Sequence, residues 1–221
     1  MTDHILDKPI RGIAQAVRDG KTSFAEVMGE AVARHERHDE ALQAFKYFDG
    51  EGAIDSARSA DALLAKGHDV GPLMGLPISA KDIFGVNGMP TYGGTSGEMD
   101  PQWAVDGPVM QALRRYLAIP TGKTHTIEFA FGAVGTSYHY GAPRNPWDAK
   151  DHRVSGGSSV GAGVSLAEGS SLLALGTDTG GSVRIPASVT GNVGLKVTNG
   201  RWSTDGIVPL STTFDTPGFL T

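Results

Sequence analysis

Hydrophobic positions in the first third of the chain recur at the spacing of an amphipathic helix. Phe24, Met28 and Ala31 lie at i, i+4 and i+7, and this pattern predicts a helix with one buried face that ends near residue 38. Ser23 and Glu26 have the spacing of a capping box, which favours a helix start at this point. Two more helices are predicted, over residues 10–18 and 52–66. We therefore expect an N-terminal helical segment over residues 1–70.

The pattern changes at residue 71, where short apolar runs alternate with helical stretches. Leu76–Ala80 and Ala118–Thr121 are short and apolar, which predicts buried strands. The other predicted features are helices over 109–117 and 160–168 and aliphatic runs at 172–175 and 207–210. Strands that alternate with helices indicate an α/β fold with a mixed β-sheet core flanked by helices. We expect residues 71–221 to form this core and residues 1–221 to form a single domain.

Composition narrows the class of protein. Among 221 residues, 19 Lys+Arg and 24 Asp+Glu give a formal net charge of −5, so non-specific binding to nucleic acid or anionic membranes is not expected. The lack of cysteine excludes disulfides, thiolate chemistry and cysteine-ligated metal sites. Residues 1–7 lack the basic-then-apolar pattern of a signal peptide, and no apolar run approaches the roughly 18 residues of a membrane span. We therefore expect a soluble cytoplasmic protein without nucleic-acid or membrane partners.

Three local patterns are similar to known sites but lack a required residue. Residues 157–161 match the nucleophile elbow of α/β-hydrolases, but all seven histidines precede this segment, whereas those enzymes place the histidine after the serine. Gly122-Lys123-Thr124 is similar to the end of a phosphate-binding loop, yet Leu117 occupies the position of a required glycine. His35 and His38 lack an acidic partner at metal-ligand spacing, so we interpret them as a solvated helix face and expect no metal site.

Glycine-rich turns beside serines are the remaining candidates for chemistry. In residues 177–182, Thr-Asp-Thr-Gly-Gly-Ser, the two glycines permit a backbone path that turns successive N–H groups toward one point, as an oxyanion requires. Residues 156–159, Gly-Gly-Ser-Ser, have a similar composition. Taken alone, each segment is more often an ordinary loop than a functional site.

Several motifs in a fixed order resemble the amidase signature family. They are Leu-Pro-x-x-x-Lys-Asp ending at Asp82, Gly-Gly-Ser-Ser at 156–159, and Gly-Thr-Asp-Thr-Gly-Gly-Ser-Val-Arg-Ile-Pro at 176–186. Supporting matches lie at residues 122–124, 128–132, 144–147, 194–196 and 215–218. The resemblance extends from about Gly75 to the end of the chain, and members of the family normally continue well beyond its last motif. We therefore expect an incomplete sheet, in either a piece of a longer chain or a shortened member.

The resemblance implies a Ser–cis-Ser–Lys catalytic unit. Ser182 corresponds to the nucleophile, Ser158 to the bridging serine that relays a proton, and Lys81 to the base. Because a lysine acts as a base only when neutral, we expect burial beside its apolar strand to lower the pKa of Lys81. Lys123 and Lys196 are alternative bases without such an apolar approach. The supporting residues are Thr179, Gly180 and Gly181 at an oxyanion hole, Ser159 beside the bridging serine, and Asp178 and Arg184 as structural partners.

The resemblance also implies an activity, the hydrolysis of the C–N bond of a linear carboxamide through an acyl-enzyme on Ser182. No metal or organic cofactor is expected, and the expected partner is a small-molecule amide, together with a second copy or a partner subunit. Two alternatives stay open: the amidase subunit of a glutamine-dependent tRNA amidotransferase, which would need partner subunits, and a catalytically inactive amidase-like binding module. At residues 125–127, His-Thr-Ile replaces the Asn-Met-Asp usual in the amidotransferase group, which argues against the first alternative.

Overall fold

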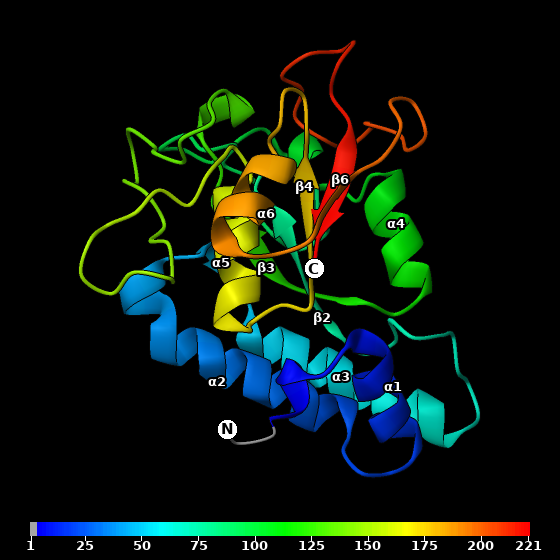
Figure 1. Cartoon of the computed structure of the whole chain (residues 1–221). Coiled ribbons are helices and arrows are strands. Elements are labelled where there is room, and N and C mark those ends of the chain that lie inside the picture. The colour runs from blue at the N-terminus through cyan, green and yellow to red at the C-terminus, as the bar shows by residue number, and fades with distance from the viewer. Residues whose placement is uncertain (1–3) are drawn as a thin grey trace.

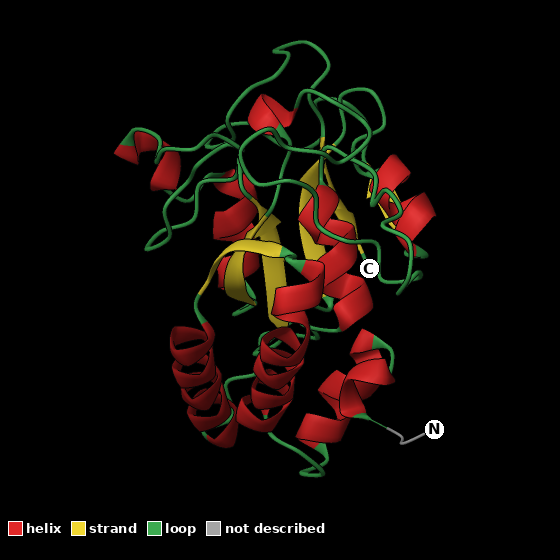
Figure 2. Cartoon of the chain, turned by 90° about the vertical axis from the view of Figure 1, so that its left-hand side faces the viewer, coloured by secondary structure: helices red, strands yellow, loops and turns green. Residues whose placement is uncertain are grey.

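The computed structural model describes residues 4–221, which form a helical layer, a sheet and a set of loops. Helices α1 (Ile10–Arg18), α2 (Phe24–Leu42) and α3 (Gly50–Ala65) lie together at the bottom of Figure 1, below the sheet. Figure 2 shows that loops gather at the end of the molecule opposite these helices. The N-terminal helices are therefore a layer of their own, as their sequence pattern predicts.

Helix α2 begins at the predicted capping box. Glu26 N–H donates to Ser23 Oγ at 3.1 Å, and Ser23 N–H donates back to Glu26 Oε2 at 2.9 Å, so each side chain satisfies a backbone donor at the helix start. The helix extends to Leu42, beyond the end expected from the periodicity of its apolar residues. The predicted start of the helix is confirmed, and only its predicted C-terminal end differs from the structure.

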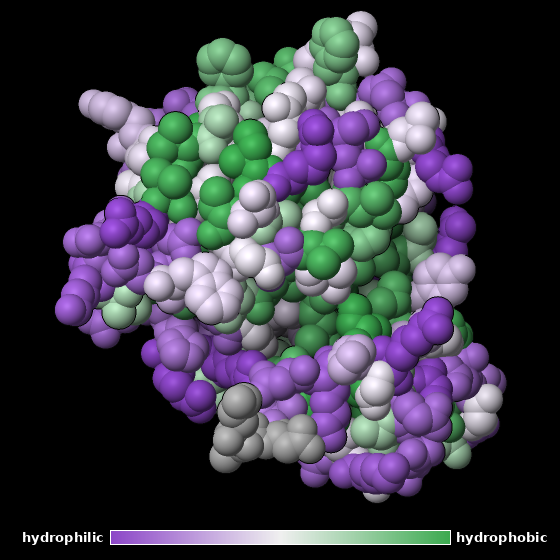
Figure 3. Space-filling model, viewed as in Figure 1, coloured by the Kyte–Doolittle hydropathy of each residue, from purple (hydrophilic) through white to green (hydrophobic). Residues whose placement is uncertain are grey.

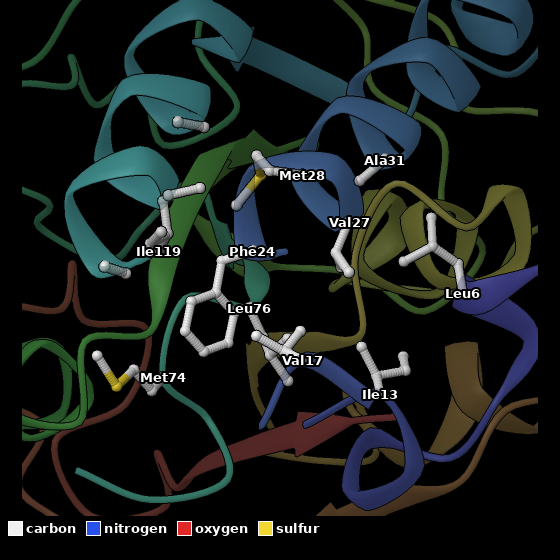
Figure 4. Packing of buried hydrophobic residues seen from close by; sticks show 13 residues of the cluster. Leu6, Ile13, Val17, Phe24, Val27, Met28, Ala31, Met74, Leu76 and Ile119 are labelled. Atoms are coloured by element: carbon white, nitrogen blue, oxygen red, sulfur yellow. The ribbon is translucent and has the colours of Figure 1, made fainter. Parts of the chain in front are cut away.

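The buried face of α2 packs against the sheet. Phe24, Met28 and Ala31 are fully buried, and Figure 4 shows Phe24 and Met28 close to Leu76 and Ile119, which lie at the start of two neighbouring strands. Removing these side chains from water is the main favourable term in docking the helical layer to the sheet.

Six strands form one sheet in the order β1-β3-β2-β4-β6-β5. They are β1 (Phe45–Phe48), β2 (Pro77–Lys81), β3 (Ile119–Thr124), β4 (Leu173–Thr177), β5 (Gly194–Lys196) and β6 (Pro217–Leu220). Strand β2 pairs in parallel with β3 and β4, and the other pairings are antiparallel. The remaining helices are α4 (Pro108–Arg115), α5 (Val160–Glu168) and α6 (Arg184–Thr190), with 3-10 turns at Ile5–Asp7, Pro101–Ala104 and Glu128–Ala130. The predicted mixed sheet flanked by helices is thus confirmed.

Residues of β2 alternate between the two faces of the sheet, as the two-residue period of a strand requires. Ser79 Oγ lies 3.1 Å from Ser165 Oγ on α5, so Ser79 and, two residues on, Lys81 face this helix. Ala80 belongs to the apolar cluster on the opposite face. Because Ala80 pairs with Lys123 of β3, Lys123 lies on that opposite face too. Two lysines on neighbouring strands therefore project to different sides of the sheet.

Some elements differ from the sequence-based expectation. Strand β1 was not predicted, because its four residues lie between two helices and are too few to show an alternating pattern. Helix α6 and strands β5 and β6 were not predicted either, and each is short. The aliphatic run at 207–210 forms no strand, and only Ile207 makes an isolated bridge, to Phe84.

The interpretation of His35 as part of a solvated face is wrong. The His35 side chain is buried, and its Nδ1 lies 3.4 Å from Glu168 Oε1 at the end of α5. Its ring centroid lies 4.9 Å from that of Phe45 and 3.8 Å from that of Phe48. Helix α5 and strand β1 cover this position, and neither contact could be read from the periodicity of α2 alone.

The start of α5 is held close to the backbone of the sheet. A Cβ atom on Gly161 would lie 2.0 Å from the carbonyl oxygen of Ala44, so no other residue fits there. This approach fixes the segment that immediately precedes Gly161, which carries Ser158 and Ser159. The glycine therefore positions the serines.

The surface is unevenly divided between polar and apolar residues. Figure 3 shows hydrophobic residues gathered over the upper part of the face seen in Figure 1, whereas the helical layer below is mainly hydrophilic. Among residues 4–221, no helix combines the length and the hydropathy needed to cross a bilayer.

Candidate active site

Polar side chains gather where the central parallel strands end. Lys81 is the last residue of β2 and Thr177 is the last residue of β4. Because β2 and β4 are parallel, their carboxyl ends meet at one edge of the sheet, which is the usual place for a ligand site in such sheets. In Figure 1 this edge lies above the strands, on the side away from α1, α2 and α3.

Lys81 is fully buried, and among residues 4–221 its Nζ forms hydrogen bonds only with hydroxyl groups. Its Nζ donates to Ser158 Oγ at 2.7 Å and to Thr177 Oγ1 at 2.9 Å. Burial lowers the pKa of Lys81 to about 7, and the negative charges of Asp215 and Asp178 only partly oppose this effect. The amine is therefore partly neutral near pH 7 and increasingly neutral above it, and only the neutral form can act as a base. The role of Thr177 was missed by the sequence analysis, although its position one residue before Asp178 in the motif is the signal that could have found it.

Ser158 and Ser159 lie between Lys81 and the segment that carries Ser182. Both serines are fully buried, and the peptide bond from Gly157 to Ser158 is cis. Ser159 N–H donates to the backbone carbonyl of Ser182 at 3.3 Å, and Ser159 Oγ donates to the Thr177 carbonyl at 3.4 Å. The structure therefore brings Lys81 into contact with Ser158, and the backbone of Ser159 into contact with that of Ser182.

Ser182 lies in the turn between β4 and α6, and its exposed fraction is 8%. The preceding residue, Gly181, has a φ of 128°, a conformation that favours glycine. A Cβ there would also lie 2.7 Å from Ile185 Cδ1. The turn that presents the Ser182 side chain thus depends on glycine at position 181.

Asp178 organises this turn and is not exposed to solvent. Its carboxylate accepts from the Gly181 N–H at 2.7 Å and from Arg184 Nε and Nη2, both at 2.9 Å. Burial acts to raise the pKa of Asp178, but Arg184 and the backbone N–H groups of Gly181, Val183 and Arg184 outweigh it, so the pKa is lowered. Asp178 and Arg184 therefore lie where structural partners of the turn are expected.

The predicted oxyanion donors are not equivalent. The Gly181 N–H is engaged by Asp178, so it is not free to receive an oxyanion in this structure. Within residues 4–221, the N–H groups of Thr179, Gly180 and Ser182 have no hydrogen-bond acceptor, and the space around Gly180 is open. Thr179 Oγ1 donates to Asp215 Oδ1 at 2.5 Å, which anchors this end of the turn.

The two alternative bases differ from each other. Lys196 is half-buried and its Nζ donates to the Val197 carbonyl at 2.8 Å. Lys123, in contrast, is as buried as Lys81, which the sequence did not predict. The cause is the inner position of β3 in the sheet, which the short apolar run before Lys123 did not reveal. Lys123 Nζ nevertheless lies 3.3 Å from the Asp82 carboxylate and bonds none of the three serines.

Metal ligation finds no support in the described part of the chain. No group of three or more His, Asp or Glu side chains within residues 4–221 is arranged to hold an ion. The groups that lie at this edge of the sheet are hydroxyls, the amine of Lys81, backbone N–H groups and the carboxylates of Asp178 and Asp215.

Comparison with known proteins identifies the family. The family model described as Amidase matches residues 26–221. A relative from Comamonas testosteroni, 2-amino-5-chloromuconic acid deaminase, is 51% identical over 94% of this chain and 45% of its own length. A glutamyl-tRNA(Gln) amidotransferase subunit from Acidothermus cellulolyticus is 41% identical over 93% of this chain and 40% of its own. The chain spans about half the length of the curated relatives that it matches.

Solved structures agree with this result. A crystal structure of an amidase superposes with a TM-score of 0.90 at 37% identity and covers 97% of this chain and 48% of its own. The peptide amidase of Stenotrophomonas maltophilia superposes with a TM-score of 0.87 at 29% identity, over 97% of this chain and 45% of its own. These matches have the same mixed sheet and span almost all of the present sequence. The chain belongs to the amidase family, whose members include hydrolases of C–N bonds.

Proposed function

We propose that the protein hydrolyses a linear carboxamide through an acyl-enzyme on Ser182, with Ser158 as proton relay and Lys81 as base. The observation that carries this proposal is the contact of 2.7 Å between Ser158 Oγ and the fully buried Lys81 Nζ, whose pKa is lowered to about 7. A neutral amine hydrogen-bonded to a serine is the arrangement that activates a hydroxyl nucleophile.

The proposed acylation step moves one proton along a defined path. As Ser182 Oγ attacks the amide carbon, its proton passes to Ser158 Oγ, and the proton of Ser158 passes to Lys81 Nζ. The resulting ammonium returns a proton through Ser158 to the leaving nitrogen, and the C–N bond breaks. A water molecule then attacks the ester on Ser182 by the same path and releases the acid. Thr177 Oγ1 accepts one N–H of Lys81, which leaves the lone pair of the neutral amine available to Ser158.

The negative charge on the carbonyl oxygen needs donors that are fixed before the reaction. In our proposal these are the N–H groups of Thr179, Gly180 and Ser182, because the Gly181 N–H is engaged by Asp178. Gly181 instead supplies the left-handed φ that turns the neighbouring N–H groups outward. Donors of this kind each contribute about 3 kcal/mol to transition-state stabilisation.

A small-molecule amide is the proposed substrate. The amide rests on the family match. The small size is supported by the relative with 51% identity, which acts, by its name, on 2-amino-5-chloromuconic acid, a small organic acid without an amide, and which is more similar to this chain than the amidotransferase subunits at 38–41% identity. The amidotransferase subunit remains the second candidate because of those relatives. Hydrolysis of small amides by this chain alone would favour the first candidate, whereas amide release that requires added partner subunits would favour the second.

The decisive experiment is labelling of the chain with a serine-reactive fluorophosphonate. We expect labelling at Ser182, none in Ser182→Ala, and at least a hundredfold slower labelling in Ser158→Ala, because the relay is then lost. Ser188→Ala is the matched control, since Ser188 is an exposed serine on the adjacent helix α6, and it should label at the normal rate. A folded chain without labelling would support the inactive binding module and contradict the proposal.

A further inference from the structure

Lys123 and Asp82 form a buried ion pair that the proposed mechanism does not use. The exposed fractions of the two residues are 0% and 1%, and Lys123 Nζ lies 3.3 Å from Asp82 Oδ1. Moving two charges out of water is costly, and an apolar pair of similar volume often stabilises a fold at least as well. Stability alone therefore does not explain why charges occupy these positions.

Both residues hold the same short segment, residues 90–94. Lys123 Nζ donates to the Pro90 carbonyl oxygen (3.2 Å) and to Thr91 Oγ1 (2.6 Å). Asp82 accepts the next two hydrogen bonds, from the Tyr92 N–H to its carboxylate (3.2 Å) and from the Gly93 N–H to its backbone carbonyl (2.9 Å). An apolar pair would leave the half-buried Pro90 carbonyl and Tyr92 N–H without these partners, which is costly, whereas Thr91 Oγ1 would still donate to the Trp103 carbonyl (2.7 Å). The ion pair therefore provides hydrogen-bond partners for the polar groups of this segment.

The segment 90–94 packs in turn against residues 127–129. Phe129 N–H donates to the Gly93 carbonyl at 2.8 Å. A Cβ atom on Gly94, whose φ is 79°, would lie 2.6 Å from the backbone nitrogen of Glu128. The two backbones are thus in direct contact, so a shift of one displaces the other.

Residues 127–129 reach the bridging serine. Ile127 N–H donates to the Ser158 carbonyl at 3.4 Å. The Ile127 Cδ1 atom lies 2.6 Å from the point that a Cβ on Gly157 would occupy, so the side chain rests against the peptide that carries Ser158. A continuous set of contacts therefore runs from the ion pair to the backbone of Ser158.

We propose that Lys123 and Asp82 are positioning residues for the amide-cleaving site, which act through segments 90–94 and 127–129 on the placement of Ser158. Lys123 donates to the loop and is not the base. Because Asp82 directly follows Lys81 in the chain, the same pair also fixes the end of strand β2. This inference rests on the proposed function, since Ser158 matters only if it relays a proton.

The test measures the labelling rate of Ser182 by a fluorophosphonate in the full chain, as a function of probe concentration and of pH. Lys123→Met should lower the maximal rate at least tenfold. Because Lys81 stays in place, the pH of half-maximal rate should remain near 7. The probe concentration that gives half the maximal rate should also be unchanged. A shift of the pH midpoint would instead make Lys123 part of the proton path and would overturn the positioning role.

A double variant separates positioning from stability. Asp82→Asn combined with Lys123→Met removes both charges, so the melting temperature should recover relative to Lys123→Met, because no unpaired charge is left buried. The labelling rate should stay low, because Met still cannot bind the Pro90 carbonyl and Thr91. Recovery of both properties together would show a merely structural pair and overturn the proposal.

Two further variants complete the experiment. Arg114→Met breaks the Asp106–Arg114 ion pair (2.5 Å), which does not bind segment 90–94, and it should lower the melting temperature while the labelling rate stays normal. If Lys123→Met fails to fold, Thr91→Val tests the proposal in its place. We expect this variant to lower the labelling rate several-fold, and an unchanged labelling rate would overturn the proposal. An unmodified chain that is never labelled would overturn the proposed function itself, which distinguishes the two failures.

Discussion

Two lysines at the ends of neighbouring parallel strands show how partners decide what a buried amine can do. Lys81 and Lys123 are both fully buried and one residue apart in register, yet they project to opposite faces of the sheet. Within the described part of the chain, Lys81 Nζ forms hydrogen bonds only with the hydroxyls of Ser158 and Thr177. Lys123 Nζ contacts the carboxylate of Asp82. Burial alone therefore does not identify a base.

Burial lowers the pKa of both amines, but the opposing effects differ. For Lys81 the opposition comes from Asp215 and Asp178, neither of which bonds its Nζ, and the pKa falls to about 7. For Lys123 the pKa is also lowered, against both the charge and the hydrogen bond of Asp82. A carboxylate in direct contact stabilises the ammonium form, which suits a structural cation. Hydroxyl partners leave the amine free to accept a proton.

Removing the amine of Lys81 should have the largest effect. Lys81→Met should lower the labelling rate of Ser182 by about a thousandfold, the usual contribution of a general base. Lys81→Arg should not restore it, because a guanidinium stays protonated at any working pH. Lys196→Met serves as the control, since Lys196 is a half-buried lysine whose Nζ bonds only a backbone carbonyl. Restored labelling with Arg would mean that position 81 supplies a charge and not a base.

Giving Lys81 a carboxylate partner should make it similar to Lys123. Thr177→Asp places an acid where Lys81 Nζ now contacts a hydroxyl at 2.9 Å. An opposite charge at this distance raises the pKa of an amine by about 1–3 units. The pH of half-maximal labelling should therefore move upward from about 7 by that amount. Thr177→Val, which removes the hydroxyl without adding charge, should not move it upward, and an equal upward shift in both variants would contradict this explanation.

The central elements and the motif positions could be predicted from the sequence because their signals are local. The capping box at Ser23, the spacing of apolar residues in α2 and the apolar run before Lys81 each depend on a few neighbouring residues. Strand β1 could not be predicted, because it depends on pairing with β3, and the burial of His35 could not, because it depends on a contact with Glu168 of α5; both partners lie far along the chain.

In the candidate site, too, some features could be predicted from the sequence and others could not. The motif order pointed to Lys81, Ser158 and Ser182, and the structure brings Lys81 into contact with Ser158. The engagement of the Gly181 N–H by Asp178 depends on the path of one turn. The burial of Lys123 depends on the order of strands in the sheet. Residue types at fixed spacing predict which groups are near one another, but not which donors are already satisfied.

The lowered pKa of Lys81 should also appear in the pH dependence of stability. The unfolded chain holds the proton up to about pH 10.4, whereas the folded chain loses it near pH 7. Between these values the unfolded state binds more protons, so the free energy of unfolding should rise with pH. The contribution of this residue approaches about 1.4 kcal/mol per pH unit. Urea titrations between pH 7.5 and 9.5 give the free energy of unfolding of the unmodified chain and of Lys81→Met. The contribution of Lys81 is the difference between the two slopes of this free energy against pH, and equal slopes would contradict the assigned pKa.

Asp82, the partner of Lys123, should give a smaller effect of opposite sign at acid pH. Burial raises the pKa of Asp82 to about 6, although the charge of Lys123 opposes it, whereas the unfolded value is near 3.9. Between about pH 4 and pH 6 the folded state therefore binds more protons than the unfolded state, and the free energy of unfolding should fall as the pH rises. Asp82→Asn removes the titrating group, so the free energy of unfolding of this variant should not show this decline between about pH 4 and pH 6. Urea titrations at pH 4.5 and 6 compare the two chains, with Asp106→Asn as the control, since Asp106 is also buried and paired with an arginine. If the unmodified chain lost no stability relative to Asp82→Asn over this range, the carboxylate of Asp82 would be as acidic as an exposed one, and the contrast between the two lysines would rest on geometry alone.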